Sequence, residues 1–150
     1  MTQFQTIGII GKWNDAAKVG PTIQRLDRYL RTRQVEVLFD ERSARMLSGR
    51  RVRGFDLDTL GQRCDVAVVV GGAGTLLHAA RSWAAMDVPL VGINLGRLGF
   101  LVDVSPETIE VCMEQILAGE LQAERRGMLA VHANGERHAA LNDVVIHKWN

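Results

Sequence analysis

The sequence contains few of the residues that mark special classes of protein. Its 150 residues include only two cysteines, Cys64 and Cys112, which are too few for a disulfide framework. Neither has a cysteine or histidine neighbour at metal-ligand spacing, so we expect both to be buried thiols. No apolar run approaches the roughly 20 residues that span a bilayer, and the opening residues lack the basic start and apolar stretch of a secretory signal. We therefore expect a cytoplasmic protein that does not associate with a membrane.

An excess of one charge sign is also lacking overall, because the formal net charge is only +1. Arginine is nevertheless concentrated in residues 25–53, which hold nine arginines against four acidic residues. Such a surface attracts polyanions, but no series of aromatic residues alternates with the arginines, as binding of single-stranded nucleic acid requires. We favour solvated faces of a helix and a loop, and expect no nucleic-acid partner.

The remaining composition, 47% hydrophobic and 23% charged, is typical of a soluble globular domain with one core. Four short apolar runs predict buried strands: 5–11, 35–40, 65–70 and 89–94. Residues 21–33 show amphipathic helical spacing, with Pro21 near the first helical position, and residues 76–86 predict a second helix. Alternating strands and helices predict a doubly wound, mainly parallel α/β sheet.

Two further stretches belong to this first domain, residues 1–119. Residues 41–62 have weak periodicity, which predicts a loop with one or two short helices. Ser105 and Pro106 predict a capped helix start, and Gly119 occupies the place of a left-handed C-terminal residue. The apolar stripe of that helix places Cys112 in the core.

The pattern changes after Gly119. Residues 128–133 and 139–147 resemble strands, and the Asn134-Gly135 pair between them is a strong hairpin signal. The sequence stops soon after the second strand, with no turn or cap to complete a sheet. We therefore expect residues 120–150 to be the beginning of a β-rich second domain that is cut short.

The most informative segment is the glycine-rich turn between the strand 65–70 and the following helix. Glycines let the backbone fold closely around a ligand, and a helix start presents unpaired N–H groups that suit phosphate. A purely structural tight turn is the alternative. The segment is neither a Walker A loop, which ends in Gly-Lys-Ser/Thr, nor the full GxGxxG fingerprint.

Three motifs identify a family. Residues 69–77, Val-Val-Gly-Gly-Ala-Gly-Thr-Leu-Leu, resemble the Gly-Gly-Asp-Gly-Thr motif shared by NAD kinases, diacylglycerol kinases and phosphofructokinases. Residues 92–101, Gly-Ile-Asn-Leu-Gly-Arg-Leu-Gly-Phe-Leu, and 141–144, Leu-Asn-Asp-Val, are similar to two further NAD kinase motifs. The resemblance therefore favours NAD kinase and implies a Rossmann-like, phosphofructokinase-like kinase domain. The family's later Gly-Ser-Thr-Ala-Tyr segment is absent from the sequence.

The resemblance implies phosphoryl transfer from ATP, or polyphosphate in some relatives, to the adenosine 2′-hydroxyl of NAD, giving NADP. Mg²⁺ or another divalent metal neutralises the phosphates in that family, and its members are homodimers or homotetramers. The motif's aspartate is the expected general base, and Ala73 replaces it here. A methyl group has no lone pair, so we expect impaired catalysis.

The resemblance also assigns contacts to the nucleotide. Gly72 and Gly74 let the backbone approach NAD, and Thr75 either caps the helix or touches phosphate. His78, one turn into the helix, faces the ligand or is a surface histidine.

Three residues further along the chain complete the expected NAD site: Phe100, Asn142 and Asp143. Phe100 packs beside the adenosine by resemblance, or is a core aromatic residue. Asn142 and Asp143 hydrogen-bond NAD, or form a turn at the entry to a strand; in a regular strand they would point to opposite faces.

Two other functions compete with an active NAD kinase. One is a non-catalytic nucleotide-binding module, either a pseudokinase or a truncated form. The other is a lipid kinase, which we disfavour because no basic amphipathic helix with a wide apolar face is evident.

Overall fold

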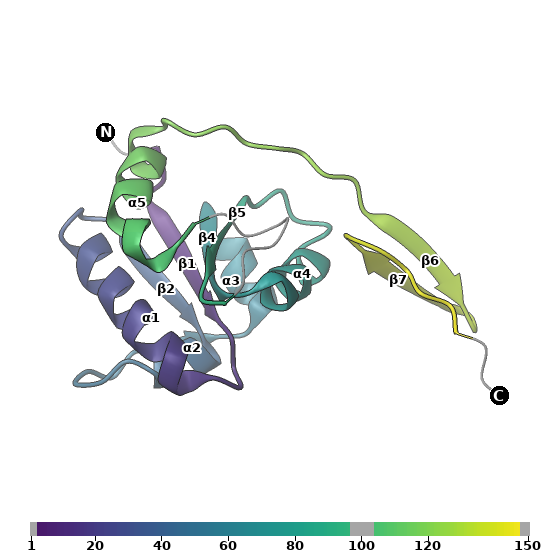
Figure 1. Cartoon of the computed structure of the whole chain (residues 1–150), viewed down its shortest axis with the longest axis horizontal. Helices are drawn as coiled ribbons and strands as arrows, with labels where there is room; N and C mark the ends of the chain where they lie inside the picture. The colour runs from purple at the N-terminus through teal and green to yellow at the C-terminus, as the bar shows by residue number, and fades with distance from the viewer. Residues whose placement is uncertain (1–2, 97–103, 148–150) are drawn as a thin grey trace.

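A computed structural model describes residues 3–96 and 104–147 of the chain. Figure 1 shows an α/β body and a two-stranded hairpin that extends from it beside the helix Ala73–Ser82. The elements run in the order β1 (Thr6–Gly11), α1 (Ala16–Arg31), β2 (Glu36–Asp40), α2 (Glu41–Arg45), β3 (Gly54–Phe55), α3 (Leu57–Arg63), β4 (Val66–Gly71), α4 (Ala73–Ser82), β5 (Leu90–Asn94), a 3₁₀ turn (Pro106–Thr108), α5 (Ile109–Ala118), β6 (Leu129–Ala133) and β7 (Glu136–Ala140).

The main sheet has five parallel strands in the order β3-β2-β1-β4-β5. This confirms the doubly wound α/β fold. The chain moves outward from β1 in one direction through β2 and in the other through β4 and β5. The order therefore reverses between β1 and β4, and in open α/β sheets ligands bind beyond the carboxyl ends of the strands at such a point.

Strand alternation divides the apolar residues between two layers. In β4, Val68 and Val70 face the layer of α1, α2 and α5, whereas Ala67 and Val69 face α3 and α4. All six residues of β4 are buried, as expected for a central parallel strand covered on both faces. The β4 strand thus anchors both halves of the core.

Helix α1 begins earlier than the sequence predicts. It starts at Ala16, so Pro21 lies inside the helix and not at its first turn. The missing N–H of Pro21 leaves the carbonyl of Ala17 without its helical donor, but Ala17 is exposed and water can hydrate it. Gly20 precedes the proline and has no Cβ to clash with its ring.

The weakly periodic stretch after β2 contains the two short helices that were expected, together with the short strand β3, which was not. Aspartates begin both helices. The Asp40 carboxylate accepts from the N–H groups of Arg42 and Ser43, and the Asp56 carboxylate accepts from the N–H of Thr59 at 2.8 Å. Asp40 is the last residue of β2 and Asp56 directly follows β3, so each cap also fixes a sharp change of chain direction.

Helix α5 ends as predicted, because Gly119 adopts a left-handed conformation with φ +78°. Its start differs: Ser105 leads into a 3₁₀ turn and its hydroxyl caps no backbone N–H. Cys112 is half-buried at the edge of the core and not within it, whereas Cys64 is buried as expected. Burial raises the pKa of the Cys64 thiol to about 11.

Ion pairs engage part of the arginine-rich stretch. Arg25 of α1 lies 2.5 Å from Glu110 of α5, and Arg50 lies 2.6 Å from the largely buried Asp27. The hydrogen bonds to Arg25 are the main cause of a lowered pKa at Glu110. These arginines therefore tie helices and loops together, as solvated structural residues do.

Asn134 and Gly135 form the tight turn between β6 and β7, with φ angles of 51° and 79°. Two positive φ angles are typical of a type I′ hairpin, which confirms the hairpin signal. The second strand is Glu136–Ala140 and not 139–147, so Asn142 and Asp143 lie beyond it. The opposite-facing strand geometry proposed for that pair is therefore wrong.

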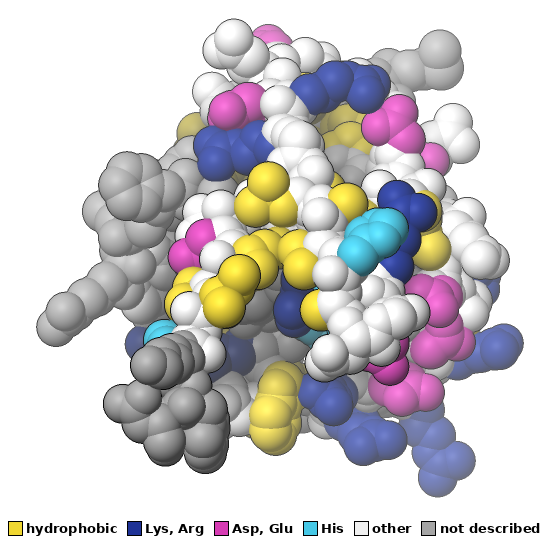
Figure 2. Space-filling model, turned by 90° about the vertical axis from the view of Figure 1, so that its right-hand side faces the viewer, with side chains coloured by type: hydrophobic (Ala, Val, Ile, Leu, Met, Phe, Trp, Pro, Cys, Tyr) yellow, Lys and Arg dark blue, Asp and Glu magenta, His cyan; other side chains and the backbone are white. Residues whose placement is uncertain are grey.

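The hairpin is mostly exposed, and Figure 2 shows hydrophobic side chains gathered on the hairpin side of the molecule. Exposed large hydrophobic residues on and after the hairpin are Leu129, Val144, Val145 and Ile146. A lone two-stranded hairpin is marginally stable. A second domain that starts at residue 120 stays a prediction. Among the described residues, no helix has the length and apolarity needed to cross a membrane.

Replacing Gly119 by alanine should destabilise the protein by about 1 to 2 kcal/mol, because an L residue is strained at this positive φ. The added Cβ would also lie 2.7 Å from Oε1 of Gln3. Urea unfolding followed by circular dichroism measures the loss. Gly127→Ala is the control, since its Cβ meets nothing within 4 Å. Equal midpoints for the two variants would contradict the expected role of Gly119.

Candidate functional site

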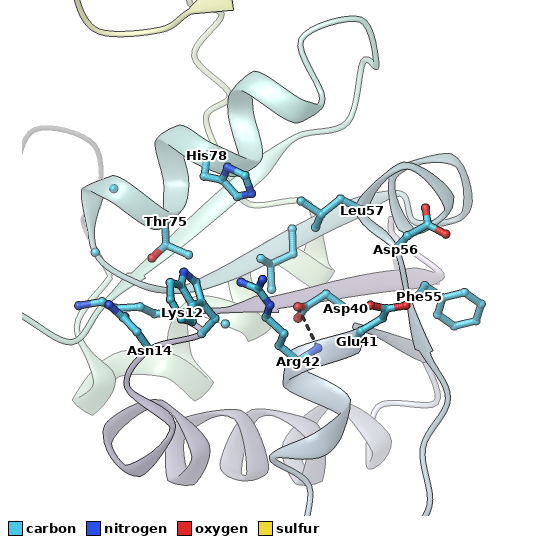
Figure 3. A pocket seen from close by; sticks show the side chains of 15 residues that line it. Lys12, Asn14, Asp40, Glu41, Arg42, Phe55, Asp56, Leu57, Thr75 and His78 are labelled. Carbon is cyan, nitrogen blue, oxygen red and sulfur yellow. Dashed lines mark hydrogen bonds between the residues drawn. The ribbon is translucent and has the colours of Figure 1, made fainter.

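A cleft of roughly 490 Å³ opens beyond the carboxyl ends of the parallel strands (Figure 3). Its walls come from the segments after β1, β2, β3 and β4, at the edge of the sheet where the strand order reverses. The lining residues are Ile10, Gly11, Lys12, Trp13, Asn14, Asp40, Glu41, Arg42, Phe55, Asp56, Leu57, Gly72, Gly74, Thr75 and His78.

The first glycine of the glycine-rich turn is required by the protein's own packing. A Cβ on Gly71 would lie 2.7 Å from Oγ1 of Thr75 and 3.0 Å from Cβ of Lys12. A backbone hydrogen bond joins the same two segments, since the N–H of Lys12 donates to the carbonyl of Val70 at 2.9 Å. Gly71 therefore lets the end of β1 and the start of α4 approach one another.

Packing does not explain the next two glycines. No heavy atom of the described chain lies within 4 Å of a Cβ built on Gly72 or Gly74. Gly72 has φ −147°, an extended conformation that any residue adopts. Both glycines line the cleft, so the space that their missing side chains leave is open to a ligand.

The turn leads directly into α4, whose first residue is Ala73. Gly72 is the N-cap and has no side chain to accept from the first helical N–H groups. The backbone N–H groups of Ala73 and Gly74 therefore lie at the positive end of a ten-residue helix, where an anion is favoured.

Thr75 is not the helix cap, which corrects one of the two roles expected for it. Helix α4 starts three residues earlier than the sequence predicts, so Thr75 lies in its first turn and its N–H donates to the carbonyl of Gly72 at 3.1 Å. The error arises because glycine is only modestly enriched at the N-cap position, where Ser, Thr, Asn and Asp are the commonest residues. Thr75 still lines the cleft, as does the exposed His78 from the same helix.

Acidic and basic side chains meet in the cleft. The carboxylates of Asp40 and Asp56 are engaged in capping α2 and α3, and the hydrogen bonds from Thr59 lower the pKa of Asp56. Lys12 follows β1, and Arg42 lies at the start of α2 with its guanidinium 5.0 Å from the ring of Trp13. Figure 3 shows the Arg42 side chain reaching up from α2 toward the side where His78 lies.

The structure brings together four of the expected site residues, because Gly72, Gly74, Thr75 and His78 line one cleft. Ala73 lies between two of them and is exposed. Asn142 and Asp143 are not among the residues that line the cleft, and Phe100 lies outside the described residues.

Sequence reasoning missed a second, cationic wall of the cleft, formed by Lys12, Trp13, Asn14 and Arg42. A signal was present: these residues directly follow the first two predicted strands, and the carboxyl ends of parallel strands form one edge. Among residues 3–96 and 104–147, no group of three or more His, Cys, Asp or Glu side chains is arranged to hold a metal ion.

Comparisons with known proteins agree on one family. The family model described as the ATP-NAD kinase N-terminal domain matches residues 7–121. An NAD kinase from Cellvibrio japonicus is 43% identical over 98% of this chain and 52% of its own length. An NAD kinase from Saccharophagus degradans is 41% identical over 98% of this chain and 51% of its own. The chain thus spans about half the length of these relatives.

Two solved structures share the fold. Yeast NADH kinase complexed with NADH aligns with 92% of this chain and 44% of its own, at a TM-score of 0.76 and 19% identity. An NAD kinase from Archaeoglobus fulgidus in complex with ATP aligns with 83% of this chain and 40% of its own, at a TM-score of 0.53 and 23% identity. These similarities establish the architecture described above.

The three glycines of the turn should respond differently to alanine. Gly71→Ala should lower the free energy of unfolding by about 1 to 3 kcal/mol, because its Cβ overpacks the contact between β1 and α4. Gly74→Ala should leave stability unchanged or raise it by up to about 1 kcal/mol, since alanine is a better helix former. Urea unfolding compares them, with Gly72→Ala as a further variant that has room. A loss at Gly72 or Gly74 as large as that at Gly71 would show that all three glycines are structural.

Proposed function

This chain belongs to the ATP-NAD kinase family, and on that premise we propose that it is the nucleotide-binding part of an NAD kinase. The reaction is phosphoryl transfer from ATP, or polyphosphate, to the adenosine 2′-hydroxyl of NAD, giving NADP. The observation that carries the proposal is the open space at Gly72 and Gly74, beside the uncapped start of α4. A pyrophosphate fits such a place because backbone N–H groups and the helix dipole both favour an anion.

The chain's own residues contribute binding and orientation. We assign Gly72 and Gly74 to close approach of the NAD backbone and Thr75 to a phosphate contact, while His78 borders the ligand from the second turn of α4. Catalysis of phosphoryl transfer consists almost entirely of such positioning and charge stabilisation. The cleft is therefore the place where donor and acceptor are aligned.

The remaining contacts to NAD come from elsewhere in the chain. We assign Asn142 and Asp143 to hydrogen bonds with NAD, and Phe100 to packing beside the adenosine. Asn142 and Asp143 lie after β7, outside any strand, so their approach to the cleft depends on what the hairpin packs against.

Mg²⁺, or another divalent metal, belongs to the proposed reaction as a partner of the phosphates. The described residues offer no cage of three ligating side chains. Such a cage is not needed for Mg²⁺, which keeps several waters and is usually bound by substrate phosphates with one or two carboxylates. Location in the cytoplasm and assembly into a homodimer or homotetramer remain predictions.

We further propose that this chain is catalytically impaired at Ala73. An aspartate in that position would stand at the first residue of α4, between two glycines that line the cleft, where its carboxylate accepts the proton of the attacking hydroxyl. A methyl group cannot accept a proton. General-base assistance is typically worth about 10²- to 10⁴-fold in rate, and that contribution is missing here.

Ala73 is also the specific observation that favours a second candidate function, a nucleotide-binding module without catalysis. Binding depends on the glycines and the helix start, neither of which needs a side chain at residue 73. The two candidates differ only in turnover.

The purified chain should not form NADP from NAD and ATP, because it lacks the carboxylate and spans only half of its relatives' length. Isothermal titration calorimetry with NAD, beside a coupled assay for NADP, separates binding from turnover. Heat of binding without product supports the non-catalytic module. Robust NADP formation would contradict the assigned role of residue 73.

Ala73→Asp should restore activity by about 10²- to 10⁴-fold in a chimera of residues 1–150 with the second half of the C. japonicus enzyme. Ala73→Asn is the matched control, because it has the shape of aspartate without its basicity. The kcat for NADP formation is the measurement. Equal rates for all three chimeras would show that Ala73 is not the decisive defect. In the 150-residue chain, Ala73→Asp should leave the thermal midpoint unchanged or raise it, since acidic residues stabilise a helix start.

A further inference from the structure

The cationic wall of the cleft carries an arginine that lies over the ring of a tryptophan. The Arg42 guanidinium lies 5.0 Å from the centroid of the Trp13 ring. Trp13 is 65% exposed, which is unusual for so large an aromatic side chain. Trp83, the other tryptophan among the described residues, is only 3% exposed. An exposed tryptophan at a cleft calls for a role other than core packing.

The two cations of this wall are Lys12 and Arg42. Across residues 3–96 and 104–147, neither Lys12 nor Arg42 forms a side-chain ion pair, although other arginines of the same stretch do. Asp40 is close to Arg42 in sequence, but its carboxylate accepts hydrogen bonds from the N–H groups that begin α2. Asp56 likewise caps α3. Only Glu41 among the lining carboxylates has no capping role.

Stacking on Trp13 suits Arg42 to bind an anion. A guanidinium held over an indole ring interacts through its positive charge, and its N–H donors match phosphate oxygens in pairs. The ring also restricts the arginine before a ligand arrives, which lowers the entropic cost of binding. Trp13 is therefore a positioning residue for Arg42.

We propose that Lys12 and Arg42, the latter held by Trp13, form a subsite for the polyphosphate chain of the phosphoryl donor. Nucleoside triphosphate and inorganic polyphosphate share this chemistry. Two separate cations suit an extended polyanion: Lys12 lies beside the glycine turn assigned to NAD, and Arg42 lies across the same cleft from Thr75 and His78 of α4. The transferred phosphoryl group then lies between the two walls. This inference rests on the proposed kinase function and adds the side from which the donor enters.

The test is binding of inorganic tripolyphosphate to the 150-residue chain at low salt, by isothermal titration calorimetry. Arg42→Gln should weaken binding about tenfold or more, because a charge-assisted, paired hydrogen bond is lost. Arg45→Gln is the matched control: Arg45 is exposed on the same short helix, carries the same charge and does not line the cleft. It should change the affinity less than about threefold.

Variants of Trp13 separate positioning from charge. Trp13→Ala should weaken tripolyphosphate binding several-fold, while Trp13→Phe, which keeps an aromatic face, should restore most of the affinity. Binding should also quench tryptophan fluorescence in the original chain, and Trp13→Phe should remove that signal. Circular dichroism confirms that each variant is folded, which is expected because both side chains are exposed.

Three outcomes overturn the subsite. The first is no tripolyphosphate binding by the original chain at about millimolar concentration, where simple phosphate ligands are expected to bind. The second is an equal loss for Arg42→Gln and Arg45→Gln, which would indicate general attraction to the basic stretch. The third is that Arg42→Gln loses NAD binding while its tripolyphosphate binding stays intact, which would place Arg42 on the acceptor side. NADP formation by the Ala73→Asp chimera tests the kinase function separately, so either proposal fails without the other.

Discussion

The cleft depends on one close contact, where the end of β1 meets the beginning of α4. The N–H of Lys12 donates to the carbonyl of Val70, and Gly71 leaves no Cβ between Lys12 and Thr75. Since α1 and α4 leave the sheet on opposite faces, this contact lies where the chain divides. Lys12 and the glycine turn therefore emerge side by side, and both walls of the cleft take their position from it.

Much of the fold was predictable because it follows from local patterns. Continuous apolar runs gave β1, β2, β4 and β5, and the Asn134-Gly135 pair gave the hairpin turn. The ends of helices and strands were harder to predict from the sequence. Pro21 is a usual first-turn residue, but a solvated carbonyl and a preceding glycine allow it inside α1. Strand β7 ends at Ala140, although apolar residues continue to Ile146, because a strand needs a partner as well as a pattern.

Only one part of the candidate site could be predicted from a local pattern. The glycine-rich turn is one contiguous segment, so a sequence motif could identify Gly72 and Gly74. The cationic wall combines segments after β1 and β2, and it exists only because parallel strands bring their carboxyl ends to one edge. Trp13 and Arg42 are 29 positions apart, and no local pattern links them. Such a pair follows from the topology and not from a motif.

The side chain of residue 73 is not part of what holds the glycine-rich turn in place. The fold holds the turn through Gly71, the hydrogen bond of Lys12 and the start of α4, and none of these involves the side chain of Ala73. That side chain is exposed and lies outside both apolar cores. The residue at position 73 can therefore differ without removing a structural support. The cleft and its two walls therefore rest on packing and backbone hydrogen bonds that do not depend on the residue at position 73.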